Sequence, residues 1–202
     1  MKEVAGVANH GWNFEVGPIK GIPNPLTAMG RFSREANMID PRTGYVYETE
    51  DGGPSGFYKF VPNSRGKLWR GGALYMLAVK NSPNIDLRVA GAAAHPIGSM
   101  WDVTWVRIDD PMAATKSCYE QGAAKGGAAF ARLEGAWWGN KTGFFLTTNG
   151  GVVGEGQIAP GDYRQSEWAG ACYSPDGKWL FVNIQTPGIT FAIKGPWGKG
   201  PL

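Results

Sequence analysis

Cysteine and histidine are scarce in this chain, and the shortage excludes several kinds of site. The 202 residues contain only Cys118 and Cys172, and only His10 and His95. Two thiols cannot build a disulfide-rich scaffold or a four-thiolate metal site, which leaves two buried thiols or a single bridge as alternatives. Neither histidine has a helix-spaced partner for zinc or a glycine-flanked serine nearby, so the pattern indicates no zinc pair and no Ser–His dyad.

Long apolar runs and a strong net charge are also missing. No apolar run has the length of a transmembrane helix, and residues 1–9, with the acidic Glu3, do not form a signal-peptide pattern. Twenty lysines and arginines against seventeen aspartates and glutamates leave a net charge of +3. This charge is too small and too evenly mixed to indicate a nucleic acid or an anionic membrane as a partner.

Glycine and proline, in contrast, are abundant, and they indicate an all-β fold. The chain has 31 glycines and 14 prolines, about twice the ordinary share. Short β-branched and aromatic runs alternate with these turn residues, and 43% hydrophobic residues are enough for a packed core. One short helix is expected over 111–125. Strands are expected over 45–49, 56–61, 73–80, 87–90, 102–108, 129–134, 143–147, 169–173, 179–184 and 190–193.

A turn of similar sequence occurs twice and indicates an internal repeat. Asp40 to Gly44 leads into one expected strand and Ser174 to Gly177 into another, each with a proline followed by a glycine. A turn and a hairpin in every unit of four antiparallel strands is typical of β-propeller blades. A β-sandwich is the alternative.

Five acidic residues at strand edges are candidate metal ligands. Each has a small residue within two positions, which lets the backbone or a ligand approach closely. If carboxylates from separate strands meet at one point, oxygen-only donors of this kind suit Ca²⁺; the alternative is a set of scattered, solvated acids. The five are Glu35, Glu50, Asp51, Glu134 and Glu167.

Arginine and tryptophan side chains add two further candidates. Arg132 lies two residues before Glu134, so both side chains would project from the same face of a strand. Beside bound cations its guanidinium would match two phosphate oxygens, and a plain surface ion pair is the alternative. The pair Trp137 and Trp138 could stack on a sugar or a base, or pack in the core.

Six motifs follow one another in order between about residues 10 and 197. They are Gly30 to Ala36, Val46 to Asp51, Pro54 to Phe60, Arg132 to Gly135, Glu167 to Gly177, and Leu180 to Thr190 with Gly195-Pro196-Trp197 behind it. Together they resemble the PhoX-type alkaline phosphatases.

The resemblance implies a six-bladed β-propeller that hydrolyses phosphate monoesters at a site holding calcium and iron (Ca²⁺ and Fe³⁺), with no organic cofactor. It also implies export by the twin-arginine route, and therefore a periplasmic or extracellular location. By the same resemblance, Glu35, Glu50, Glu134 and Glu167 are metal ligands, Asp51 is a neighbouring ligand or an acid that contacts the ligands, and Arg132 is the catalytic phosphate clamp.

The sequence also departs from the family pattern. Upstream of the His-Gly-Trp stretch seen here at His10 to Trp12, the family carries a Cys-Glu-Glu segment that supplies a thiolate and carboxylates to iron, and this chain begins after it. Arg34 stands where histidine is expected, and only eight residues separate Ile158 from Glu167. At about 40 to 50 residues per blade, the length corresponds to some four blades. We therefore expect residues 1–202 to form one propeller-type domain that is part of a larger six-bladed propeller. A catalytically inactive structural or binding protein derived from a propeller is the alternative function.

Overall fold

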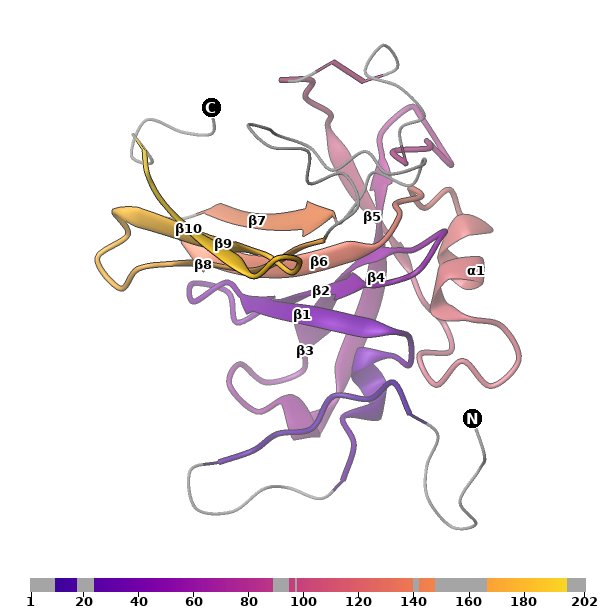
Figure 1. Cartoon of the computed structure of the whole chain (residues 1–202). Coiled ribbons are helices and arrows are strands. Elements are labelled where there is room, and N and C mark those ends of the chain that lie inside the picture. The colour runs from indigo at the N-terminus through magenta and orange to yellow at the C-terminus, as the bar shows by residue number, and fades with distance from the viewer. Residues whose placement is uncertain are drawn as a thin grey trace.

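Three antiparallel sheets make up most of the computed structural model, which describes residues 10–17, 24–88, 95–96, 98–139, 142–147 and 167–195 (Figure 1). The first sheet has the order β1-β2-β3-β4-β5, the second β6-β7 and the third β10-β9-β8. Among the described residues, no helix is long and apolar enough to cross a membrane. The elements are η1 (Thr27–Met29), β1 (Arg34–Ile39), β2 (Val46–Glu50), β3 (Phe57–Pro62), η2 (Leu68–Arg70), β4 (Gly72–Val79), β5 (Val103–Arg107), α1 (Cys118–Ala123), β6 (Leu133–Gly139), β7 (Thr142–Thr147), β8 (Trp168–Tyr173), β9 (Trp179–Ile184) and β10 (Ile189–Lys194).

The predicted all-β fold is confirmed, but the first sheet contains five strands where the blade pattern predicted four. The additional strand is β1, whose residues Arg34–Ile39 were not expected to form a strand. Its sequence Arg-Glu-Ala-Asn-Met-Ile is too polar to give the apolar alternation of a strand, and its burial pattern is correspondingly mixed. The strand expected over 87–90 is not seen at residues 87 and 88, its described part; the residue just before them, Asp86, forms an isolated bridge with Ala129. Residues 89–90 lie outside the described residues.

The helix is shorter than predicted because the side chain of Asp110 holds residues 110–114, at the start of the expected helix, in a turn. Its carboxylate accepts hydrogen bonds from the N–H groups of Met112 (3.1 Å) and Ala114 (2.8 Å), which competes with helix formation. The helix α1 therefore begins only after Ser117. Ser117 and Glu120 form a reciprocal capping box that satisfies the first N–H groups.

The repeated turn opens two hairpins in equivalent positions. Gly44 N–H donates to Asp40 O (2.8 Å) between β1 and β2, and Gly177 N–H donates to Ser174 O (2.8 Å) between β8 and β9. Both glycines have positive φ, +75° and +67°, a conformation that glycine adopts without steric cost. Each turn thus joins the first two strands of its sheet.

The middle strands of the five-stranded sheet, β2 to β4, carry buried residues on both faces. Alternate residues of β2, β3 and β4, such as Val46, Phe60 and Leu74, point into one cluster that also contains Cys118 of α1. Phe57 and Met38 point into the other cluster, with Leu133 of β6. Because β6 contacts β1 and β2 on one side and β8 on the other, it connects the three sheets.

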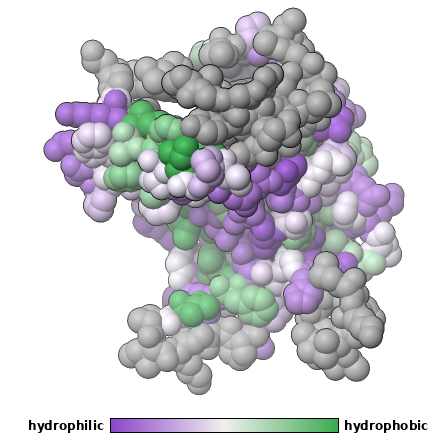
Figure 2. All heavy atoms as spheres, in the orientation of Figure 1, coloured by the Kyte–Doolittle hydropathy of each residue, from purple (hydrophilic) through white to green (hydrophobic). Residues whose placement is uncertain are grey.

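The two cysteines are both free. Cys118 is buried and Cys172 is half-buried, so the structure has two thiols and no bridge. Figure 2 shows hydrophobic side chains on the surface in the region of the β8–β10 sheet. Trp179 of β9 and Ile193 of β10 are large side chains exposed there.

Candidate metal centre

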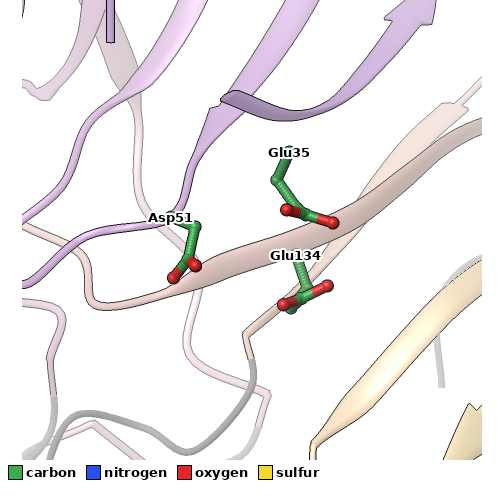
Figure 3. A group of neighbouring side chains, drawn as sticks. All are labelled: Glu35, Asp51 and Glu134. Carbon is green, nitrogen blue, oxygen red and sulfur yellow. The ribbon is translucent and has the colours of Figure 1, made fainter. Parts of the chain in front are cut away.

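Three carboxylates from different strands point toward one another. Glu35 lies in β1, Asp51 directly follows β2 and Glu134 lies in β6 (Figure 3). Their ligand oxygens all lie within 4.8 Å of one another. Glu35 is exposed, Asp51 is half-buried and Glu134 is buried. We refer to Glu35, Asp51 and Glu134 as the carboxylate cluster.

Irregular strand pairing positions two of these side chains. The pairing of β1 with β2 shifts between Arg34 and Asn37, around Glu35. The pairing of β6 with β7 shifts between Leu133 and Ala136, around Glu134. A bulge of this kind changes the direction of a side chain and is common beside functional sites.

Backbone hydrogen bonds hold the segment that carries Asp51 against the segment that leads into β6. Ser55 and Phe130 exchange two of them, of 2.8 and 2.9 Å, and Arg132 N–H donates to Gly52 O at 2.7 Å. Asp51 N–H in turn donates to Ser33 O at 2.8 Å, at the start of β1. The three cluster residues therefore stand on a backbone framework that is joined across their strands.

Arg132 links the carboxylate cluster to a fourth acid. Its Nε donates to Asp51 Oδ1 at 3.2 Å, and its Nη2 donates to the carboxylate of Glu167, just before β8. The Arg132 side chain is 35% exposed. Its backbone adopts a left-handed φ of +49°. This conformation is strained for residues other than glycine, and such strained residues are common at functional sites.

The cluster carries an excess of negative charge, and the pKa values of two of its members are raised. Burial, followed by the charges of Glu35, Glu167 and Asp51, raises the pKa of Glu134 to about 7, while Arg132 opposes the shift. Desolvation and then the charge of Asp51 also raise the pKa of Glu35, which a hydrogen bond with Glu134 partly offsets. Four carboxylates thus share one guanidinium, an arrangement that favours a bound cation.

The structure does not bring Glu50 into this group. Its Oε2 accepts a hydrogen bond from Gly56 N–H (2.8 Å) and another from the Tyr58 hydroxyl (2.7 Å) in the buried interior. Neighbouring residues of a strand project to opposite faces, so Glu50 points into the core while Asp51 points to the cluster. The sequence pattern placed both acids at the strand end without distinguishing their directions.

Sequence reasoning missed a second acidic site, in which Glu48 is completely buried. Its Oε1 accepts hydrogen bonds from Asn13 Nδ2 (2.8 Å) and from Arg34 Nη1. Burial raises the pKa of Glu48 to about 7 against the opposing effects of Arg34 and Asn13. Arg34, which stands where the family resemblance led us to expect histidine, is therefore the counter-charge of a buried acid. The regular alternation of Val46, Glu48 and Glu50 along β2 is the signal that could have placed Glu48 in the core.

A cleft of about 330 Å³ lies beside the carboxylate cluster. It is lined by residues 35–37 of β1, 135–137 of β6 and 170–172 of β8. Glu35 belongs to both the cluster and the cleft. The pairing of β8 with β9 also shifts here, between Ala169 and Cys172, so all three strands are irregular where they border the cleft.

Comparison with known families assigns the chain that carries this site to a protein family. The family model of the alkaline phosphatase PhoX matches residues 3–161. This chain belongs to the PhoX alkaline phosphatase family. The resemblance predicted from the sequence motifs is thereby confirmed. The matched segment contains the carboxylate cluster and Arg132, and it ends before Glu167.

A solved structure shows the same fold as this PhoX-family chain. It is Pseudomonas fluorescens PhoX in complex with vanadate, a transition-state analogue, with a TM-score of 0.52 and 18% sequence identity. The alignment covers 91% of this chain and 34% of the Pseudomonas chain. The likeness supports the β-propeller type of fold, and this chain spans about a third of the length of that relative. No curated protein matches the chain.

Proposed function

We propose that this PhoX-family chain is a metal-dependent phosphomonoesterase that releases inorganic phosphate from phosphate monoesters. The observation that supports this function is the carboxylate cluster of Glu35, Asp51 and Glu134 with Arg132 at its edge. We further propose that the chain is one propeller-type domain, part of a larger six-bladed propeller. We also propose a periplasmic or extracellular location, which the family membership supports.

The residues of the cluster fit a hard cation. They offer oxygen donors from three separate backbone segments, and burial together with the neighbouring carboxylates raises the pKa of Glu134 although Arg132 opposes the shift. Ca²⁺ takes six to eight oxygen ligands, mostly carboxylates, carbonyls and waters, so the cluster would supply part of such a shell. We propose Ca²⁺ at Glu35, Asp51 and Glu134, with Glu167 close by through Arg132. For Fe³⁺, the second ion that the family implies, the cluster offers carboxylates and no thiolate among the described residues.

Each residue would have a distinct role in phosphate binding. Bound cations would neutralise the phosphate and polarise its phosphorus atom. Arg132 is held by Asp51 and Glu167 at the edge of the cluster and is accessible to solutes. Its planar guanidinium would pair with two oxygens of the phosphate, a geometry that lysine does not reproduce.

One observation favours the alternative of a binding or structural protein without hydrolytic activity. Cys118 lies in the core cluster beneath α1 rather than beside the carboxylates. Burial raises the pKa of its thiol to about 12, so it does not offer a thiolate to iron. A chain that binds only calcium could retain the scaffold without the chemistry.

Hydrolysis of p-nitrophenyl phosphate by the full chain, with added Ca²⁺ and Fe³⁺, tests the proposal. We expect turnover that EDTA abolishes, and elemental analysis that finds calcium in stoichiometric amount. Arg132→Ala should lower kcat/KM about 100-fold, as expected for loss of a preorganised charged donor. Arg88→Ala is the matched control, because Arg88 pairs with Asp86 on the surface, and it should retain full activity. Stoichiometric calcium without turnover would support the binding alternative.

A further inference from the structure

The cleft of about 330 Å³ adjoins the proposed phosphate site. Glu35 contributes to both, and Gly135 of the cleft directly follows Glu134 of the cluster. A phosphate held at the cluster would therefore have its ester oxygen, and the group attached to it, near the entrance of this cleft. The volume lies within the range of small-molecule sites and accommodates a ring-sized group.

Glycines let β6 and β8 approach each other closely beside the cleft. A Cβ at Gly135 would come within 3.1 Å of Ala171 N, so β6 and β8 approach too closely there for a larger residue. Gly170 has a φ of +60°, and a Cβ at that position would meet Asn183 Nδ2 at 2.7 Å. At this border of the cleft the backbone of β6 thus packs directly against the backbone of β8.

The lining is mostly small and apolar, with Glu35 and Asn37 as its polar side chains, and it includes one large exposed ring. Apart from Glu35, the described residues that line the cleft carry no formal charge. Trp137 lines it and is 44% exposed. Its neighbour Trp138 instead stacks on Tyr47 in the core, with ring centroids 5.9 Å apart. Of the two tryptophans, Trp138 is a packing residue and Trp137 is available to a ligand.

We propose that this cleft binds the leaving group of the phosphate monoester and that Trp137 selects flat, uncharged leaving groups by stacking on them. The inference rests on the proposed function and specifies its substrate class as aryl and heterocyclic monoesters. Aromatic pairs gain energy beyond the burial of their area, whereas an aliphatic alcohol offers no ring to stack. A leaving group with a further anionic charge would meet Glu35 and no described cation in the lining.

Binding of two non-hydrolysable phosphonates separates this subsite from the phosphate site. Isothermal titration of the full chain with Ca²⁺ should give tighter binding of phenylphosphonate than of methylphosphonate. Trp137→Ala should weaken phenylphosphonate about three- to tenfold and leave methylphosphonate unchanged. Trp137→Phe should restore most of the difference, because it keeps a ring. Trp179→Ala, which removes a tryptophan of β9 that is 38% exposed and does not line the cleft, is the matched control.

Turnover distinguishes failure of this inference from failure of the proposed function. Trp137→Ala should raise KM for phenyl phosphate while leaving KM for glycerol 2-phosphate and both kcat values near those of the wild type. Selective loss of phenylphosphonate binding in a protein without turnover would support the subsite and refute the phosphatase. Normal turnover with equal effects of Trp137→Ala on both substrates, or equal affinity for the two phosphonates, would overturn the subsite alone.

Discussion

Replacing Glu134 by glutamine should have opposite effects on stability with and without calcium. The substitution removes one negative charge from the cluster and keeps the size of the side chain. The amide can still donate a hydrogen bond to Glu35, as the protonated acid does. In the absence of cations, the variant should therefore be more stable than the wild type above neutral pH.

The size of this difference in stability follows from the pKa of Glu134, which is raised from 4.5 to about 7 in the folded protein. Because the folded-state pKa is the higher one, the folded protein binds more protons than the unfolded chain between these values. The contribution of protonated Glu134 to the stability of the wild type is fully present below pH 4.5 and is lost as the pH rises through about 7. Each pKa unit corresponds to about 1.4 kcal/mol, and solvent at the open side of the cluster reduces the effect, so we expect about 1 to 2 kcal/mol.

Thermal unfolding at pH 8 provides the assay, in EDTA and in excess Ca²⁺. In EDTA, Glu134→Gln should raise Tm by about 2 to 6 °C. With Ca²⁺ at about 100 times its Kd, the wild type should gain about 2.7 kcal/mol, and the variant much less. Glu50→Gln is the matched control, because Glu50 points into the core, and its response to Ca²⁺ should equal that of the wild type.

Two results would refute this reasoning. If Glu134→Gln is less stable than the wild type in EDTA, the negative charge of Glu134 does not destabilise the folded protein. An undiminished response to Ca²⁺ in that variant would remove Glu134 from the cation site. Loss of the Ca²⁺ response in Glu50→Gln would show that Glu50 belongs to the site.

Two further substitutions test the framework around the cluster. Arg34→Ala leaves Glu48 buried without its counter-charge and should lower the free energy of unfolding, measured in urea, by about 3 to 5 kcal/mol. Arg42→Ala removes an 82% exposed side chain and should leave this free energy almost unchanged. Equal losses in the two variants would contradict the role of Arg34. Gly135→Ala forces a Cβ to 3.1 Å from Ala171 N and should lower the free energy of unfolding by about 1 to 3 kcal/mol. At Gly53 a Cβ meets nothing within 4 Å, so a similar loss for Gly53→Ala would show that crowding is not the cause.

Much of the strand pattern could be predicted because local sequence carries it. The apolar runs that became β3, β4 and β9 lie within one residue of their predicted bounds, and the two repeated turns open hairpins as their Pro and Gly residues indicate. Strand β1 could not be predicted in this way. Its polar residues are ordered by pairing with β2 in a hairpin and by the contact with β6, and β6 lies far from β1 in the sequence.

The sequence by itself determined the all-β class, the turn chemistry and, through its ordered motifs, the PhoX family. It also supplied the right kinds of residue, because carboxylates beside small residues mark a site where backbone segments approach closely. Only the tertiary structure decided which acids meet. Glu35, Asp51 and Glu134 converge because bulges in β1 and β6 turn them to one point. Glu48 and Glu50 face the core, since a single residue of register along β2 selects the face on which each side chain lies.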